Sequence, residues 1–315
     1  MMRTSRAVVA LTVLLALLVG ATTASAHGNH LSADSQVSGD GSVMVERLFV
    51  DQDAYLVLHA DDGGNPGEVI GHKAVSRGFH APISVNMSDG FWQSMDGNET
   101  VWAVLHEDNG DGEFDPESDA ELQAFGGAAA TPLTVRKATG SVSVAAAGFS
   151  VKETQENEVT IPQVTAGQSS FLVLKTNTNG SPGDIVGHAT LTPGTQTDVH
   201  VAINETYFDA QQAQFLLWAT VYEDNGDGEF DPATDTLVTA GDAPVASLFT
   251  VAKPLGDNSG GVGVNTPTET ATETTAASQP SETTTTTDTS GSGFGVLAVL
   301  VALAAFVCVQ LGRQV

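Results

Sequence analysis

The residues best suited to chemistry in this sequence are the acidic ones of a run that occurs twice. The run E-D-N-G-D-G-E-F-D-P spans Glu107–Pro116 and recurs at Glu223–Pro232, an offset of 116 residues. Carboxylates and an amide stand near glycines that allow a sharp turn. Calcium loops place oxygen ligands at alternate positions around such a glycine. The run therefore predicts one Ca²⁺ site in each copy.

The expected ligands follow from placing Glu107 at position 1 of a calcium loop, which puts Gly112 at the turn position. They are Glu107, Asn109, Asp111, Glu113 through its carbonyl, Asp115 and Asp119, and in the second copy Glu223, Asn225, Asp227, Glu229, Asp231 and Asp235. Position 1 is normally Asp, and the last ligand comes one residue late, so the loop is at most EF-hand-like. The alternative is a solvated acidic turn on a salt-adapted surface, and the sequence leaves both open.

Histidines offer a second chemistry, the binding of Cu²⁺. A mature N-terminus at His27, with His30 close by, could chelate copper through its amine and imidazole. Further ligands could come from His59, His80 and His106, whose matching positions in the second copy are Lys175, Gln196 and Tyr222. A copper site would therefore belong to the first copy alone. The alternative is ordinary polar surface histidines. His72 and His188, which both copies share, are interpreted as structural side chains.

The same offset aligns far more than the acidic run, without a gap from Val43 to Lys137. Leu56–Leu58 falls on Leu172–Leu174, and Gly71-His72 falls on Gly187-His188. A fixed period of this kind indicates one domain duplicated. We expect the domains at residues 27–138 and 139–253, each long enough to bury a core of its own.

Both copies read as β-structure. Asp198–Ile203 alternates polar and apolar residues, which is typical of a half-buried strand. Further strands are expected at 43–45, 169–175, 214–222 and 247–251, separated by glycine- and proline-rich turns. The chain is therefore predicted to be all-β, with two tandem immunoglobulin-like antiparallel β-sandwich domains.

The two ends of the chain predict its location. Residues 1–26 have the basic start, apolar stretch and small-residue cleavage site of a secretory signal peptide. Residues 254–292 form a Thr-rich segment that we expect to be a disordered, O-glycosylated stalk. Residues 293–315 contain an apolar run, Phe294–Leu311, that as a helix would reach about 27 Å, enough to cross a bilayer. The protein is thus expected to be secreted and anchored at the outer face of the membrane.

Composition narrows the partners. The chain has 38 acidic and 11 basic residues and a formal net charge of −27, which excludes nucleic acid as a natural partner and suits a concentrated salt medium. The single cysteine, Cys308, lies in the apolar terminal run, so disulfides and cysteine metal sites are not expected in the globular part. Secretion makes the sequons at Asn86, Asn98 and Asn204 candidates for glycosylation.

Signatures of enzymes are missing from the sequence. It has no G-x-S-x-G, H-E-x-x-H or P-loop motif, so we expect no catalysis. Trp92, Trp102 and Trp218 could form a sugar platform, but the last two lie in aligned apolar strands and are interpreted as core.

The pattern Y-L-V-L-H…N-P-G-E-V-I-G-H…V-W-A-V-L-H-E-D-N-G-D-G-E-F-D-P, with its second copy, resembles a haloarchaeal tandem surface domain of unknown function. The tail resembles the PGF-CTERM sorting signal, with Ser292-Gly293-Phe294 in place of Pro-Gly-Phe. That resemblance implies an archaeosortase-type processing enzyme and cell-envelope or S-layer components as partners. A trimmed, lipid-linked end and an intact helix both stay open. The expected role is structural or adhesive, and the alternative is an extracellular copper- or small-ligand-binding protein that uses the mature N-terminal histidine.

Overall fold

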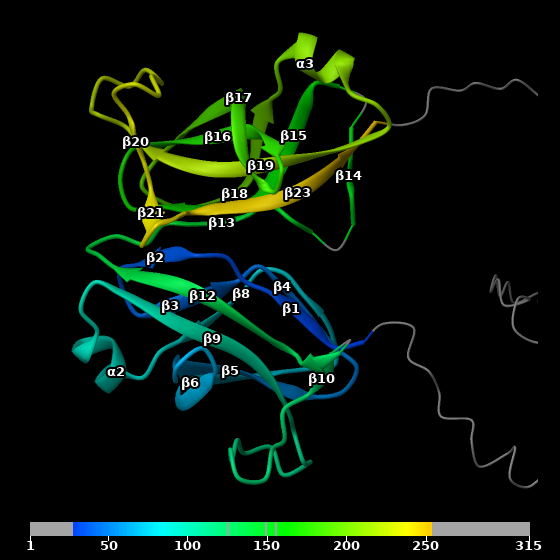
Figure 1. Ribbon diagram of the computed structural model, residues 1–315, viewed down its shortest axis with the longest axis vertical. Coiled ribbons are helices and arrows are strands. Elements are labelled where there is room, and N and C mark those ends of the chain that lie inside the picture. The colour runs from blue at the N-terminus through cyan, green and yellow to red at the C-terminus, as the bar shows by residue number, and fades with distance from the viewer. Residues whose placement is uncertain (1–27, 125, 149, 155, 254–315) are drawn as a thin grey trace, which may run out of the picture. The chain divides into compact units, whose positions relative to one another are not determined.

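The computed structural model describes residues 28–253, apart from 125, 149 and 155. These residues belong to one compact unit of the chain (Figure 1). The expected signal peptide, stalk and membrane segment, and His27, lie outside the described residues. Within residues 28–253, no helix has the length and apolar character needed to span a membrane.

The first repeat is built from two layers of strands. One layer is a five-stranded sheet in the order β2-β12-β9-β5-β6. Its strands are β2 (Gln36–Ser38), β12 (Ala130–Lys137), β9 (Asn98–Glu107), β5 (Ala54–Asp61) and β6 (Pro66–Val75). The other layer contains β1 (His30–Ser32), β4 (Arg47–Val50) and β7 (Gly78–His80), and the pair β3 (Ser42–Val45) and β8 (Ile83–Asn86). A short hairpin joins β10 (Gln123–Ala124) to β11 (Gly127–Ala128).

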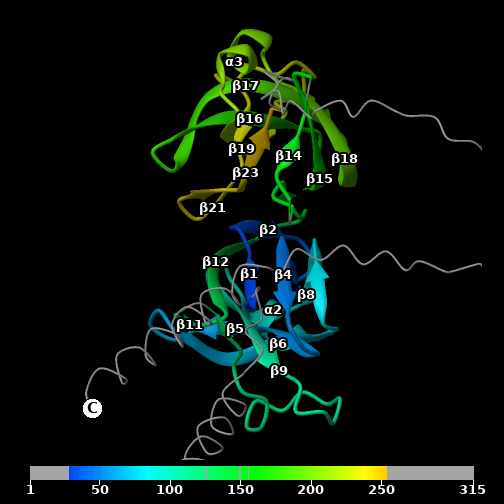
Figure 2. The same cartoon turned by 90° about the vertical axis from the view of Figure 1, so that its right-hand side faces the viewer.

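The second repeat has the same two layers (Figure 2). Its larger sheet contains β14 (Lys152–Glu153), β23 (Ala246–Ala252), β19 (Gln214–Glu223), β16 (Ser170–Thr178) and β17 (Ser181–Leu191), with β20 (Thr236–Leu237) paired to β19. The smaller sheet contains β13 (Ser143–Ala145), β15 (Glu158–Ala166) and β18 (Gly194–Ala202). A hairpin joins β21 (Thr239–Ala240) to β22 (Ala243–Pro244). Each repeat also has one short helix, α2 (Asp89–Ser94) or α3 (Glu205–Ala210).

The repeat offset holds at the level of elements. The long strand β9 lies 116 residues before β19, and α2 lies 116 residues before α3. The smaller layers differ, because β15 and β18 are continuous whereas the matching segments of the first repeat are each split in two. One split falls at Glu46 and the other at Ala81-Pro82, where proline removes a ladder donor. The prediction of two tandem immunoglobulin-like β-sandwiches is confirmed.

A hydrophobic core lies between the layers of each repeat. Leu56, Leu58 and Leu105 are fully buried in the first, and Leu172, Leu174 and Leu217 are fully buried in the second. Because successive side chains of a strand point to opposite faces, the residues between these leucines face outward from the sandwich. Several of those are buried too, so something covers the outer face.

The tryptophans of β9 and β19 lie on that outer face and are half-buried. The indole nitrogen of Trp102 donates to Asp61 Oδ1 at 2.7 Å, and that of Trp218 donates to Asn177 Oδ1 at 3.0 Å. Their interpretation as core residues was wrong, because strand alternation places them on the sheet face turned away from the core.

Candidate acidic-loop site

Each acidic loop begins where the long strand β9 or β19 ends and continues as an irregular connection (Figures 1 and 2). In the first repeat, the carboxylate of Asp108 accepts the N–H groups of Gly110 at 2.8 Å and Gly112 at 3.3 Å through one oxygen. Both glycines have positive φ, 101° and 74°, a conformation that glycine adopts without steric cost. The glycines therefore let the chain wrap around the Asp108 side chain.

The next polar side chains bond the loop backbone in series. Asn109 Oδ1 accepts the N–H of Asp111 at 3.1 Å, and Asp111 Oδ1 accepts the N–H of Glu113 at 2.9 Å. Asp115 Oδ1 accepts the N–H of Glu117 at 3.0 Å. Each of these carboxylates uses one oxygen on the backbone and keeps a second oxygen with which it could bind a cation.

Asp119 closes the loop. Its side chain is only 1% exposed, and its two oxygens accept the N–H groups of Asn109 at 3.2 Å and Asp115 at 2.9 Å. A buried carboxylate with two backbone donors holds both ends of the acidic segment together. Asp119 is therefore better placed to organise the loop than to be its last metal ligand.

The second loop repeats this hydrogen bonding. Asp224 accepts the N–H groups of Gly226 and Gly228 at 2.8 and 3.2 Å. Asp235 accepts those of Asn225 and Asp231 at 3.1 and 2.8 Å. The run common to both loops thus encodes one backbone geometry.

A phenylalanine anchors each loop to the outer face of the sheet. The Phe114 ring lies 5.3 Å from that of Tyr55, 4.8 Å from His72 and 5.5 Å from His106. In the second repeat Phe230 packs in the same way, and its ring partners are Phe171, His188 and Tyr222. The shared histidines therefore support the loop, in agreement with their structural interpretation.

The predicted ligand set does not include the aspartate that caps the two glycines. The side chain inside the loop is that of Asp108 or Asp224, which the sequence reasoning missed, whereas Glu107 and Glu223 end their strands. The spacing D-x-G-x-G would have identified this aspartate, because a carboxylate that accepts two glycine N–H groups needs glycines two and four residues after it. Among residues 28–253, no three His, Cys, Asp or Glu side chains are grouped closely enough to hold a metal ion.

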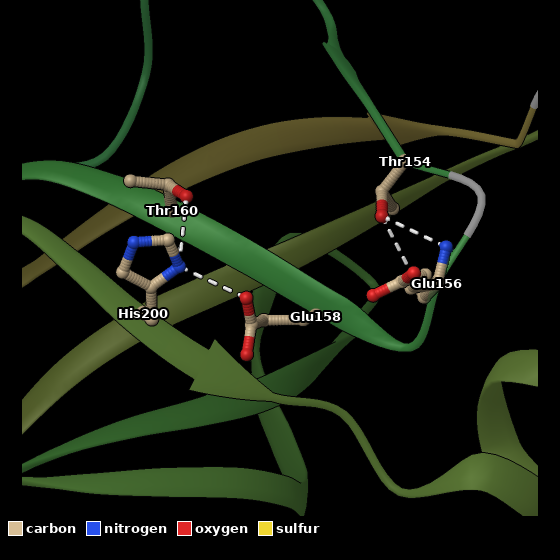
Figure 3. Close-up of polar contacts among 5 residues, drawn as sticks. All are labelled: Thr154, Glu156, Glu158, Thr160 and His200. Carbon is tan, nitrogen blue, oxygen red and sulfur yellow. Dashed lines mark hydrogen bonds and ion pairs between the residues drawn. The ribbon is translucent and has the colours of Figure 1, made fainter.

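The loop carboxylates have no basic partner within the described part of the chain. The one close contact there between a basic side chain and a carboxylate joins His200 Nδ1 to Glu158 Oε1 at 2.9 Å, beside Thr160, on an exposed part of the smaller sheet (Figure 3). Eight carboxylates lie between residues 107 and 121 of the first loop. Their mutual repulsion favours any cation that can be held among them.

The candidate copper ligands separate into two places. His30 and His80 belong to β1 and β7 of the smaller layer, where the His30 ring stacks on Phe49. His59 and His106 meet on the outer face of the larger sheet, with their Nε2 atoms 3.2 Å apart. At the matching positions of the second repeat, Lys175 Nζ donates to the Tyr222 hydroxyl at 3.0 Å.

The three sequon asparagines are all exposed. Asn86 ends β8, and Asn98 begins β9 and accepts the N–H of Gly241 at 2.9 Å. Asn204 caps α3 by accepting the N–H of Tyr207 at 3.0 Å. Glycosylation at these positions stays a prediction.

Fold and site together define a tandem β-sandwich protein with an acidic loop packed on each larger sheet. The chain belongs to the family described as a domain of unknown function (DUF7282), which matches residues 29–136 and again 145–252. No curated protein matches the chain.

Among solved structures, the chain is similar to a crystal structure of CBD12 from CALX1.2, with 10% identity, coverage of 71% of this chain and 99% of that chain, and a TM-score of 0.21. It is also similar to the periplasmic chaperone SfaE, with 12% identity, coverage of 63% and 95%, and a TM-score of 0.20. Tandem immunoglobulin domains of titin match with 6% identity, coverage of 71% and 94%, and a TM-score of 0.17. At these scores the fold assignment depends on the strand pairing described above.

Proposed function

We propose that this protein is a non-catalytic surface module whose two acidic loops each bind one Ca²⁺, with a structural or adhesive role. The observation that carries the proposal is the loop itself. The hydrogen bonds from its backbone N–H groups to side chains recur in both repeats, from the aspartate that caps two glycines to the buried aspartate that closes the loop.

The ligands would be carboxylate oxygens left free by the backbone hydrogen bonds, and the Asn109 amide oxygen through its second lone pair. For the first loop we propose side chains of Asp108, Asn109, Asp111 and Asp115, the carbonyl of Glu113, and Glu107 from the strand end. Ca²⁺ accepts six to eight oxygens in flexible geometry, which suits a loop that must turn several carboxylates inward. Mg²⁺ demands near-ideal octahedral geometry and gives up its waters reluctantly, so it should bind more weakly.

A location outside the cell forms part of the proposal. Residues 1–26 would direct secretion, and residues 293–315 would hold the protein at the outer face of the membrane, among envelope or S-layer components. These assignments rest on sequence patterns. A chain that ends before Gly291 should appear in the culture medium, and its retention with membranes would contradict the anchor.

Thermal unfolding with and without cations tests the calcium sites. At a free Ca²⁺ concentration ten times the dissociation constant, binding at one site stabilises the folded domain by about 1.4 kcal/mol. This raises the melting temperature by a few degrees. The wild-type protein should therefore have a higher melting temperature with Ca²⁺ than with the same concentration of Mg²⁺. The variant Asp111→Ala/Asp227→Ala should lose this difference. The measurement belongs in concentrated monovalent salt, where general charge screening is already complete.

A matched control separates a calcium site from a loss of negative charge. Glu68 and Asp184 are exposed and occupy equivalent positions in the two repeats, away from the loops. Glu68→Ala/Asp184→Ala removes the same charge and should keep the calcium-specific shift. Equal shifts by Ca²⁺ and Mg²⁺ in wild type and both variants would show that the loops are only acidic turns.

A further inference from the structure

The pair formed by His59 and His106 has an unusual geometry. His59 lies on β5 opposite Trp102, and His106 lies on β9 opposite Tyr55, so the two rings reach toward each other along the strands. The rings are nearly parallel, at 17°, and their centroids are 5.3 Å apart. The Nε2 atoms are only 3.2 Å apart, so nitrogen faces nitrogen close to the ring planes rather than ring face to ring face.

Both outer nitrogens of the pair are already fixed as donors. His59 Nδ1 lies 2.8 Å from the carbonyl oxygen of Gly67, and His106 Nδ1 lies 2.8 Å from that of Asp119. A carbonyl oxygen can only accept, so each Nδ1 must carry a proton. A neutral imidazole has one proton, which leaves both Nε2 atoms with lone pairs that point at each other.

The contact between the two Nε2 atoms therefore lacks a proton or a cation that both lone pairs could bind. Two polar contacts join the rings to backbone carbonyls and a third joins the rings to each other, whereas two neutral rings supply only two protons. Both side chains are buried, His59 with 6% and His106 with 4% exposure, so water has little access to the gap. Burial also lowers the pKa of His59, which favours its neutral ring.

We propose that His59 and His106 form a linear, two-coordinate site for a soft monovalent cation of the Cu(I) type. Metal-binding histidines characteristically donate the other ring N–H to a backbone carbonyl or carboxylate, as both rings do here. Zinc prefers four ligands in a tetrahedron, whereas this site offers two opposed nitrogens. Two metal–nitrogen bonds in line need about 4 Å, so the rings would separate by less than about 1 Å.

The second repeat provides a natural variant without the site. Lys175 and Tyr222 replace the two histidines, and their direct hydrogen bond has the proton that the histidine pair lacks. Tyr222 also keeps the edge contact with the loop phenylalanine, with ring centroids 5.5 Å apart as for His106 and Phe114. The double variant His59→Lys/His106→Tyr should therefore fold.

Titration with Ag⁺, a redox-inert probe with the same coordination preference, tests the proposal. Full-length protein is used in chloride-free nitrate buffer, with Cys308 alkylated in every sample. By calorimetry, wild type should bind one more Ag⁺ than His59→Lys/His106→Tyr. His80→Ala, which removes a histidine of the other layer, should match wild type. The variant His106→Gln, which leaves a single imidazole, should also lose the site.

Nitrogen NMR of the imidazoles shows where the ion is held. The Nε2 resonances of His59 and His106 should shift on Ag⁺ addition, while both Nδ1 atoms stay protonated. Equal Ag⁺ stoichiometry in wild type and the double variant would overturn the proposal. So would unchanged Nε2 resonances, which would mean that the pair holds only a shared proton.

Discussion

At the scale of residues, the acidic loop depends on side chains that bond the backbone. Asp108 holds the turn, and Asp119 joins the two ends of the acidic segment from a buried position. Neither role is that of a simple solvent-exposed charge. Loop shape and charge density are therefore set by the same aspartates.

Replacement of Asp119 by alanine should open the first loop. The N–H groups of Asn109 and Asp115 would lose their acceptor, at a cost of about 1–3 kcal/mol. We expect faster amide hydrogen exchange across residues 109–115 and a lower melting temperature. Glu117→Ala removes an exposed carboxylate of the same loop and should leave both unchanged. Exchange rates that respond equally to the two variants would refute the closing role of Asp119.

Part of the shape of this loop can be predicted from the sequence. The alternation of oxygen-bearing side chains around Gly112 could be read directly. The position of Asp108 could not, because the calcium-loop register placed Glu107 first and the cap on two glycines is a local backbone contact. The meeting of His59 with His106 was also beyond the sequence, since it depends on the pairing of β5 with β9.

At the scale of elements, one glycine in each repeat allows two strands to approach closely. A Cβ at Gly71 would overlap the carbonyl oxygen of Asn86, and one at Gly187 would overlap that of Ala202. Each glycine precedes a histidine that supports the acidic loop. The close approach of the two strands therefore fixes the position of β6 or β17, the strand that carries this histidine.

Substitution of Gly187 by alanine should force β17 and β18 apart. Overpacking of this kind costs about 1–3 kcal/mol, which urea unfolding would measure. Gly90→Ala is the matched control, because it lies in helix α2 with open space around its Cβ position. Alanine there should be neutral or stabilising by up to about 1 kcal/mol. A Gly187→Ala variant as stable as wild type would disprove the steric account.

At the scale of the whole molecule, the repeats share buried polar contacts. Glu46 is 2% exposed and accepts the N–H groups of Ala146 and Ala147 at 2.9 and 2.7 Å, as well as the Ser247 hydroxyl. Burial raises the pKa of Glu46. Burial and the negative charge of Glu46 raise the pKa of nearby Asp34, and the positive charge of Arg47 lowers it, so that the pKa is about 7. Two carboxyls thus meet where the first repeat contacts the second.

Stability should consequently fall as the pH rises toward neutral. The folded chain retains a proton on Asp34 between its ordinary pKa of 3.8 and about 7, whereas the unfolded chain releases it. The unfolded state then binds fewer protons, so the free energy of unfolding decreases as the pH rises through this window. Unfolding at pH 5 and pH 7.5 should show a smaller decrease for Asp34→Asn than for wild type. The exposed control Asp62→Asn should behave as wild type, and an Asp34→Asn profile that matches both would contradict this linkage.

The duplicated architecture was the most predictable property of the molecule. The gap-free offset predicted the same strand order in the two repeats, and the short apolar runs between turns predicted a sandwich. What the sequence could not supply was the difference between the repeats. The splits of the smaller layer at Glu46 and Pro82, and the use of Glu46 as a buried acceptor for the second repeat, depend on contacts between distant segments.

The most direct test of the central claim is the number of Ca²⁺ ions bound by the full chain. Equilibrium dialysis against radioactive Ca²⁺ in concentrated monovalent salt should give two ions per wild-type chain. Asp111→Ala or Asp227→Ala alone should leave one, and the double variant none, while Glu68→Ala/Asp184→Ala should retain two. Binding that is unchanged in the double variant, or equally reduced in all four variants, would contradict a specific calcium site in each acidic loop.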